Sequence, residues 1–194
     1  MCLLAICKTR KLTKEEFENS WDYNDDGFGM GWKDAQHRVH FVKGIMKLED
    51  ALSEYEHIDA RCKHIVHFRK ASVGGRIAEL THPFLVSEGS PISLEGHDVD
   101  SPLLFHNGHW ADYKQILIML EIATGKMITD PISDTRVAAM YLARVGNGAI
   151  TRFGYNRVAL LTPEKERSII YSGEFVDENG VLFSNTSYKY SYKR

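Results

Sequence analysis

Cys2 is the first position at which the sequence could do chemistry. Cysteine is small, so we expect Met1 to be removed, which would leave Cys2 with a free α-amine. The reference pKa values of an α-amine, about 7.7–8.0, and of a thiol, about 8.5, are close enough for the amine to take the thiol proton near neutral pH. An N-terminal amine can activate its own side chain as a nucleophile in this way. Taken alone, chance or packing in a strand explains the cysteine more simply.

Arg69 stands at the end of a predicted strand, and Ser72, Gly74 and Gly75 follow it. An arginine can hold a carboxylate through two parallel N–H bonds, and glycines let the backbone approach a ligand. The simpler explanation of this segment by itself is a solvated arginine beside a glycine turn.

The segment His106-Asn107-Gly108-His109 contains an Asn-Gly pair, which by itself predicts a hairpin turn. The same pair could offer a side-chain amide and a backbone N–H to a developing oxyanion. His106 and His109 raise the alternative of a metal site, but their spacing is weakly specific and no Cys/His cluster completes it. We therefore expect neither a metal nor a cofactor.

Ser133-Asp134-Thr135 opens a predicted helix. A serine is a favourable N-cap, and an aspartate complements the positive end of the helix dipole. Asp134 could also receive the ammonium group of a substrate.

Apolar runs and helical spacing predict the elements that would position these residues. Thr13-Lys14-Glu15-Glu16 has the pattern of a capping box at the start of a helix. Further helices are expected around 48–55, 116–122 and 137–142, and strands around 2–7, 28–32, 37–42, 62–68, 157–161 and 168–171. The predicted strands lie near the two ends of the sequence, and the two most clearly predicted helices lie between them. This order favours an α+β domain.

Length and composition indicate one globular domain spanning residues 1–194. Of the 194 residues 43% are hydrophobic and 26% charged, and the formal net charge is −2. This balance gives no support to nucleic-acid or membrane-surface binding, and no apolar run approaches the roughly 20 residues of a membrane helix. Three sparse cysteines, an odd number, argue against a disulfide framework. We expect a reduced, cytoplasmic protein.

The remaining conspicuous residues are expected to be structural. Cys7 and Cys62 have nothing nearby in the sequence that would activate a thiol. The basic, aromatic tail 188–194 permits a nucleic-acid interpretation, but an edge strand or a loose tail explains it better. Three histidines are expected to be hydrogen-bonding scaffold residues: His64, His67 and His82.

Taken in order, the four segments resemble the glutaminase domain of class II glutamine amidotransferases, which are N-terminal-nucleophile hydrolases. Members of that family begin Met-Cys and carry His-x-Arg-x-Ala-Thr/Ser, His-Asn-Gly and Ser-Asp-Thr segments in succession. The turn 24–29, the segment His82-Pro83-Phe84 and the segments 173–175 and 182–185 are also similar to family segments. The resemblance spans nearly the whole chain, and its specificity comes from the ordered set.

The resemblance implies a four-layer αββα sandwich with two packed, mainly antiparallel sheets. It also implies hydrolysis of the glutamine side-chain amide through a γ-glutamyl thioester on Cys2, with the α-amine as base. Asn107 and Gly108 would form the oxyanion hole. Arg69 would hold the substrate α-carboxylate and Asp134 its α-ammonium group. The implied set is completed by Ser72, which stands where the family has threonine in its glutamine-binding loop.

Two departures from the family pattern keep other functions open. Leu3 stands where many relatives have glycine, and Val73 where several have histidine, and both are expected to adjoin the pocket. A related hydrolase of γ-glutamyl peptides or other small amides is the first alternative, and a catalytically silent binding module is the second. Because few residues remain after the glutaminase-like region, we expect no fused synthase domain and a separate synthase as the ammonia acceptor.

Overall fold

The computed structural model describes residues 2–191 and contains two β-sheets, of seven and four strands. None of its helices is both long and apolar enough to pass through a lipid bilayer. All the strand pairs of both sheets are antiparallel. In the larger sheet the strand order is β10 (Val176–Glu178), β11 (Val181–Phe183), β1 (Leu3–Cys7), β4 (His64–Phe68), β2 (Phe28–Lys33), β3 (Val39–Ile45) and β6 (Glu95–Gly96). In the smaller sheet it is β5 (Phe84–Leu85), β7 (Leu103–Asn107), β8 (Arg157–Leu161) and β9 (Ile169–Ser172).

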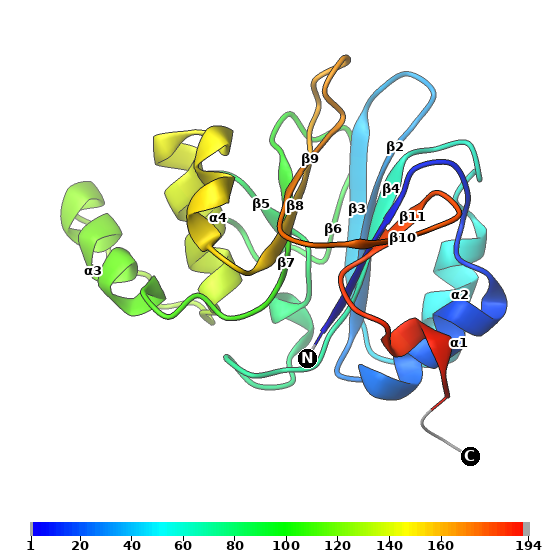
Figure 1. Ribbon diagram of the computed structural model, residues 1–194. Coiled ribbons are helices and arrows are strands. Elements are labelled where there is room, and N and C mark those ends of the chain that lie inside the picture. Colours follow the sequence, from blue (N-terminus) through cyan, green and yellow to red (C-terminus); the bar gives the residue numbers. More distant parts are fainter. Residues whose placement is uncertain (1, 192–194) are drawn as a thin grey trace.

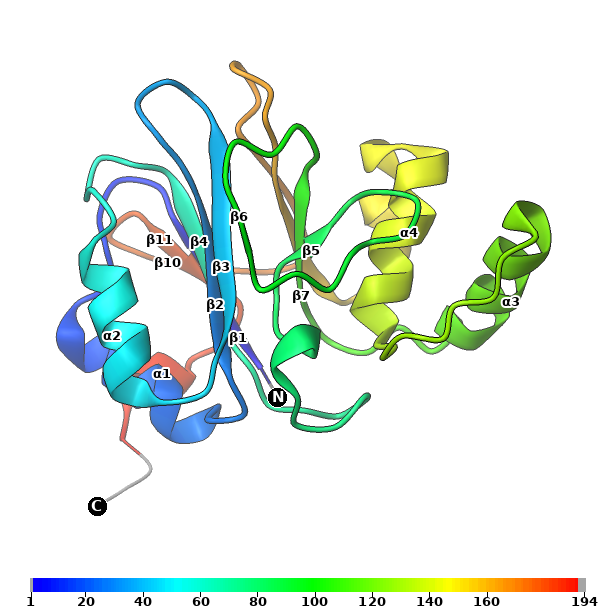
Figure 2. The same cartoon turned by 180° about the vertical axis from the view of Figure 1, so that it is seen from behind.

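Helices cover the outer face of each sheet (Figures 1 and 2). The larger sheet carries α1 (Lys14–Tyr23) and α2 (Leu48–Glu56), and the smaller carries α4 (Asp134–Val145), with α3 (Tyr113–Thr124) packed outside α4. Short 3₁₀ turns are η1 (Ala78–Leu80), η2 (Asn147–Phe153) and η3 (Ser187–Lys189). The layers therefore run helix, sheet, sheet, helix, and the predicted αββα sandwich is confirmed.

Strand β1 lies between the two cores and is fully buried along its length. Successive side chains of a strand point to opposite faces. Leu3 and Ala5 pack in the core between the larger sheet and its helices, whereas Leu4 and Ile6 pack between the two sheets. Burial on both faces explains why the sequence shows one continuous apolar run at this strand.

Glycines in β2 let the smaller sheet and the segment that leads into its β5 pack closely against the larger sheet. A Cβ on Gly29 would lie 1.9 Å from the carbonyl oxygen of His82, and one on Gly31 would lie 2.7 Å from Leu103. Met30, between them, faces the helices instead. The glycines of this strand therefore serve close packing between the sheets.

The N-termini of α1 and α4 carry the caps that the sequence predicts. Thr13 caps α1 with a complete capping box, because its side chain accepts from the N–H of Glu16 and the Glu16 side chain accepts from the N–H of Thr13. Ser133 caps α4 by accepting from the N–H of Arg136 at 3.1 Å. Both predicted caps are confirmed.

Three local expectations were wrong. The strand predicted from His37 begins only at Val39, because His37 lies in the preceding turn with a φ of 66°. Asn107-Gly108 is not a hairpin turn, since Asn107 ends β7 and the chain continues toward α3. Tyr188 is neither in an edge strand nor loose, because it is buried and stacks on Phe183 with ring centroids 3.7 Å apart; residues 192–194 of that segment lie outside the described residues.

The close approach of the sheets at Gly29 predicts an overpacking penalty. Gly29→Ala should lower the free energy of unfolding by about 1–3 kcal/mol, because the added methyl group meets the backbone carbonyl of His82, which cannot move without shifting the segment that leads into β5. Denaturant unfolding measures the difference. Gly148→Ala is the matched control, since a Cβ there meets nothing within 4 Å. Equal stability of the two variants would contradict this packing.

Candidate active site

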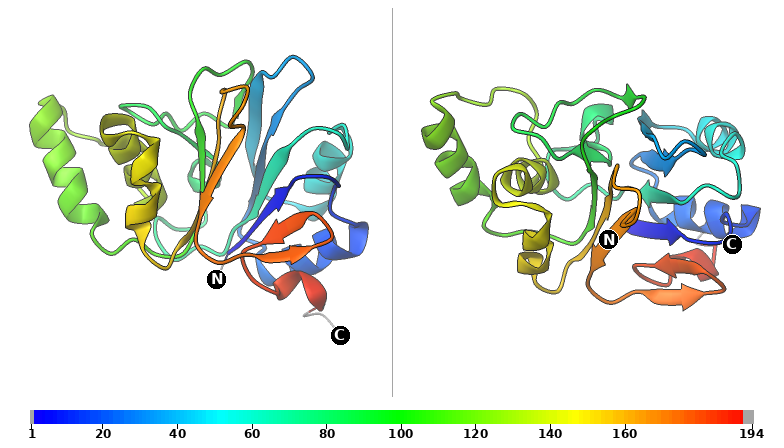
Figure 3. Two further views of the ribbon diagram at one scale, coloured as in Figure 1. Left: turned by 45° about the horizontal axis from the view of Figure 1, so that its top comes forward. Right: turned by 90° about the horizontal axis from the view of Figure 1, so that it is seen from above.

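Five of the six residues expected to react with or bind the substrate line one small cavity. They are Cys2, Arg69, Ser72, Gly108 and Asp134. The cavity holds about 20 Å³, and its lining includes residues from the start of β1 and from the segments that follow β4 and β7. Figure 3 shows that β1 begins between the two sheets. Asn107 is not among the lining residues, although it immediately precedes Gly108. A space of this size accommodates about one water molecule.

The Cys2 sulfur is held against the backbone that follows β4. The N–H of Lys70 donates to Sγ at 3.2 Å, and Sγ lies 3.3 Å from the Lys70 carbonyl oxygen. The Asn185 carboxamide donates to the Cys2 carbonyl oxygen at 2.7 Å. Burial raises the pKa of the Cys2 thiol, while the Lys70 N–H opposes that rise. A thiol with a raised pKa needs a nearby base to act as a nucleophile at neutral pH.

The Asn107 side chain reaches toward β1 through a serine. Its Nδ2 atom lies 2.8 Å from the Ser184 hydroxyl oxygen, which also accepts from the N–H of Leu4 at 2.9 Å. The Oδ1 atom of Asn107 is buried without a hydrogen-bond partner among the described residues. One hydroxyl therefore links this carboxamide to the backbone two residues after Cys2.

Gly108 occupies a position that requires glycine. Its φ is +154°, and a Cβ would lie 1.7 Å from Oδ1 of Asn156. The same Oδ1 accepts from the N–H of His109 at 2.9 Å. Asn156 thus holds the segment after β7 so that Gly108 reaches the cavity.

Arg69 is buried and organises the loop that follows it. Its two terminal nitrogens donate to the carbonyl oxygens of Gly75 at 2.7 Å and Val73 at 3.0 Å. Its own N–H donates to Gly27 at 2.8 Å, and its carbonyl accepts from Asp26 at 3.0 Å. Burial lowers the pKa of Arg69, but a guanidinium stays charged in proteins. The turn before β2 therefore fixes a cation at the cavity wall.

Asp134 is buried at the first position of α4. Its two oxygens accept from the N–H groups of Thr135 at 2.9 Å and Trp110 at 3.0 Å. His109 approaches it at 3.5 Å and His106 at 3.9 Å. The carboxylate is thus held rigidly, which suits recognition of a cation in the cavity.

Three buried histidines lie at the cavity, and none of them was expected to react with or bind the substrate. His82 and His106 line the cavity, and the His67 ring lies 3.8 Å from the His82 ring, centroid to centroid. Burial lowers the pKa of all three, that of His67 to about 3. His64 and His67 make hydrogen bonds, but both ring nitrogens of His82 lack a partner within residues 2–191, so the scaffold hydrogen-bonding role expected of His82 was wrong. A lone histidine before proline gives no sequence signal of this burial.

The two departures from the family pattern differ in position. Val73 lines the cavity, as expected. Leu3 does not, because its side chain is fully buried in the core on the helix side of β1. Within the described part of the chain no three His, Cys, Asp or Glu side chains form a group that could hold a metal ion. Of the two histidines considered as a metal pair, His106 also lies 3.0 Å from the Thr135 hydroxyl.

The buried histidines predict loss of stability in acid. A histidine in the unfolded chain binds a proton near pH 6.5, whereas folded His67 binds one only near pH 3. The unfolded state therefore binds more protons between these values, so stability is retained above about pH 6.5 and falls with decreasing pH, by up to about 1.4 kcal/mol per pH unit for each group.

Urea unfolding between pH 7 and pH 5 tests this effect. His67→Gln removes one such group and should flatten the dependence of unfolding free energy on pH. The exposed His97→Gln is the control and should follow the wild-type slope. Parallel curves for wild type and His67→Gln would contradict the assignment.

Comparison with known proteins finds similarity in structure only. No protein-family model matches the chain, and no curated protein sequence matches it significantly. The structure of glutamine phosphoribosylpyrophosphate amidotransferase from B. subtilis, with ADP and GMP bound, is similar over 94% of this chain and 41% of that one, with a TM-score of 0.62 and 16% identity.

A second structure, an allosteric regulatory enzyme of purine biosynthesis, is similar over 88% of this chain and 35% of that one, with a TM-score of 0.56 and 18% identity. The chain thus spans less than half the length of either protein. Identity this low establishes the fold alone, and that fold agrees with the ordered motifs of the sequence. The chain shares its four-layer αββα fold with the matched part of glutamine phosphoribosylpyrophosphate amidotransferase.

Proposed function

We propose that this protein is a glutaminase of the class II amidotransferase type, with Cys2 as its nucleophile. The observation that carries the proposal is the gathering of a thiol, a buried guanidinium and a buried carboxylate around one cavity. The zwitterionic α-carbon of glutamine matches one cation and one anion at fixed positions. Arg69 would bind the α-carboxylate, Asp134 the α-ammonium group, and Ser72 would lie beside the bound substrate.

The reaction would begin when the α-amine of Cys2 takes the thiol proton. The thiolate then attacks the side-chain carbonyl carbon, and the resulting oxyanion accepts hydrogen bonds from Asn107 and Gly108. Collapse breaks the C–N bond, and the α-ammonium group gives its proton to the leaving ammonia. Water, deprotonated by the same amine, hydrolyses the γ-glutamyl thioester to glutamate and restores the thiol. No cofactor is needed for these steps.

Substrate entry requires the loop after Arg69 to move. A cavity of about 20 Å³ is too small for an amino acid. The carbonyl oxygens of Val73 and Gly75 occupy two N–H groups of Arg69. A bound carboxylate would take their place with stronger, charge-assisted bonds, so loop opening and carboxylate binding would be coupled.

The hydrogen bonds around Asn107 support its role as an oxyanion donor. The Ser184 oxygen already accepts from Leu4, while Asn107 Oδ1 has no donor. Turning the Asn107 carboxamide by 180° would let the Ser184 hydroxyl donate to Oδ1 and would free Nδ2. Because Oδ1 and Nδ2 are distinguished only by their hydrogen-bond partners, we infer that Ser184 orients Asn107 with its N–H groups toward the substrate.

The ammonia would pass to a separate synthase as acceptor. Residues 2–191 form one αββα sandwich, which supports our assignment of this stretch to a single glutaminase domain. The cysteines Cys2, Cys7 and Cys62 are free, which suits the reducing cytoplasm.

A glutamine-analogue diazoketone should label mature protein once, on Cys2, after loss of Met1. Intact-mass and peptide mass spectrometry locate the adduct. Cys2→Ala should abolish both labelling and ammonia release from glutamine, whereas Cys62→Ala, which removes the other partly exposed thiol, should leave both unchanged.

Two results would contradict this function. One is a mature chain that retains Met1 and still turns over glutamine. The other is hydrolysis of γ-glutamyl dipeptides with a kcat/KM above that for glutamine, which would favour the peptide hydrolase. Binding of glutamine without any turnover by Met-processed protein would instead support a silent binding module.

Ser184→Ala should lower kcat for glutamine by about tenfold to a hundredfold and leave KM nearly unchanged, because it loosens an oxyanion donor without touching the α-carbon contacts. Ser184→Thr keeps the hydroxyl and should restore most of the activity. In a double-mutant cycle, Ser184→Ala should cost nothing further once Asn107→Ala is present. Additive losses would show that Ser184 does not act through Asn107.

A further inference from the structure

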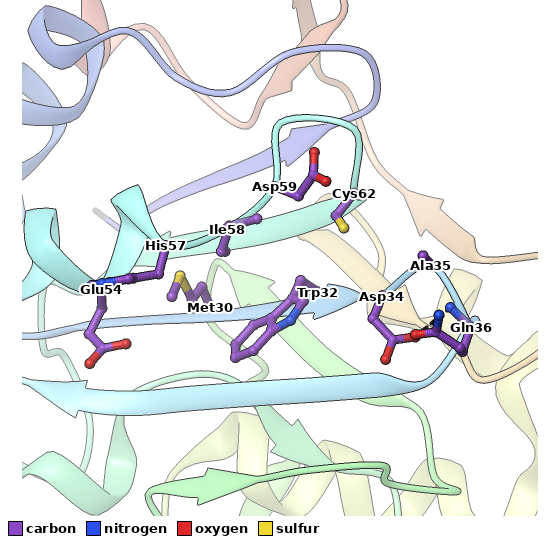
Figure 4. Close-up of a pocket in the computed structure, with 10 residues that line it drawn as sticks. All are labelled: Met30, Trp32, Asp34, Ala35, Gln36, Glu54, His57, Ile58, Asp59 and Cys62. Atoms are coloured by element: carbon purple, nitrogen blue, oxygen red, sulfur yellow. Dashed lines mark hydrogen bonds between the residues drawn. The ribbon is translucent and has the colours of Figure 1, made fainter.

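A second hollow lies at the opposite end of β2 and β4 from Cys2. It consists of two adjoining cavities of about 350 and 370 Å³, which share the residues Asp34, Ala35, Asp59 and Cys62. The length of β4, about 16 Å at 3.3 Å per residue, separates it from the proposed active site. Cavities of this size are typical of sites for small molecules. We refer to the two together as the hairpin cleft, because the β2–β3 turn forms one wall (Figure 4).

One half of the hairpin cleft offers a flat apolar surface. Met30, Trp32 and Ile58 line it, and Figure 4 shows Trp32 between the end of α2 and the β2–β3 turn. The Trp32 ring stacks on His40 with centroids 5.4 Å apart and an interplanar angle of 19°. A fixed, partly buried indole is a suitable surface for the planar ring of a ligand.

The other half of the hairpin cleft carries lysines without carboxylate partners. Lys33 is buried, and its ammonium group donates to the Glu164 carbonyl and to the Ser168 hydroxyl. Within residues 2–191 no carboxylate lies within ion-pair distance of the Lys33, Lys63 or Lys165 ammonium groups. Burial and, to a smaller extent, the nearby charge of Lys63 lower the pKa of Lys33, while the charge of Glu164 opposes that shift.

The acids at the junction of the two cavities are already neutralised. Asp34 accepts from the Arg38 side chain at 2.7 Å, from His40 at 3.1 Å and from two backbone N–H groups. Asp59 pairs with Arg61 at 2.6 Å. These carboxylates therefore do not cancel the charge of the lysines.

We propose that the hairpin cleft binds a phosphate monoester of a flat ring-containing molecule, about the size of a nucleoside monophosphate. The ring would lie on Trp32, and the phosphate would be held by Lys33, Lys63 and Lys165. Three lysines suit a dianion better than a singly charged carboxylate, because each supplies a compact point charge. This site is separate from Cys2 and does not depend on the proposed glutaminase activity.

Isothermal titration calorimetry of the full chain with AMP tests the proposal. AMP should bind, while adenosine and inorganic phosphate should each bind at least tenfold more weakly, because each lacks one of the two recognised groups. Added salt should weaken AMP binding through screening of the lysines. Absence of AMP binding up to about 1 mM, near −4 kcal/mol, would overturn the proposal. If adenosine bound as tightly as AMP, the lysines would not recognise the phosphate. If inorganic phosphate bound as tightly as AMP, Trp32 would not recognise the ring.

Variants locate the binding to the hairpin cleft. Two variants should each weaken AMP binding at least tenfold: the double variant Lys63→Gln/Lys165→Gln and the single variant Trp32→Leu. The charge-matched control Lys47→Gln/Lys126→Gln removes two exposed lysines elsewhere and should bind AMP like the wild type. Thermal unfolding verifies that each variant is folded. Equal AMP affinity of the wild type and the Lys63→Gln/Lys165→Gln variant would place the ligand elsewhere and overturn the assignment.

Discussion

The pairing of β1 with β4 on one side and β11 on the other is the constraint on which the candidate site depends. Pairing with β4 sets Leu3 opposite Phe68, which places Cys2 beside the backbone of Lys70. Continuation past β11 brings Ser184 to Leu4 and Asn185 to the Cys2 carbonyl. Backbone hydrogen bonds in a buried strand are costly to break. The position of the sulfur is therefore fixed by a fully buried interior strand of the larger sheet.

Desolvation gives this arrangement its chemical character. Arg69 and Asp134 are buried charges, each held by hydrogen bonds to its own segment of chain. The three histidines beneath them are kept uncharged by burial. Electrostatic interactions in such a dry site are stronger than in water. The histidine side of the cavity is thus uncharged. The fixed charges of Arg69 and Asp134 lie where the α-carboxylate and α-ammonium groups of the proposed substrate would bind.

The sequence predicted the elements better than the contacts between them. The continuous apolar run of β1, the capping box of α1 and the Ser133 cap are local signals, and each corresponds to the element found. The αββα layering was implied by the family resemblance that the ordered motifs carry. By contrast, the helix-side position of Leu3 depends on which face of β1 each residue takes, and that is set by strand register.

Parts of the candidate site could not be read from the sequence for the same reason. The Ser184 contact with Asn107 joins positions 77 residues apart. The hairpin cleft likewise brings Lys33 against Ser168, 135 residues away. Neither pair leaves a periodic or local signal, because each exists only after the sheets have paired and packed. The buried His82 is a further case, since its environment comes from both sheets.

The most direct test of the central claim is a crystal structure of Met-processed protein with a glutamine-analogue diazoketone bound covalently. The account predicts a bond from the Cys2 sulfur to the inhibitor. It also predicts that the adjacent inhibitor oxygen lies about 2.7–3.1 Å from the Asn107 side-chain nitrogen and from the Gly108 backbone nitrogen. An adduct whose oxygen points away from both donors, or one attached to Cys62, would contradict it.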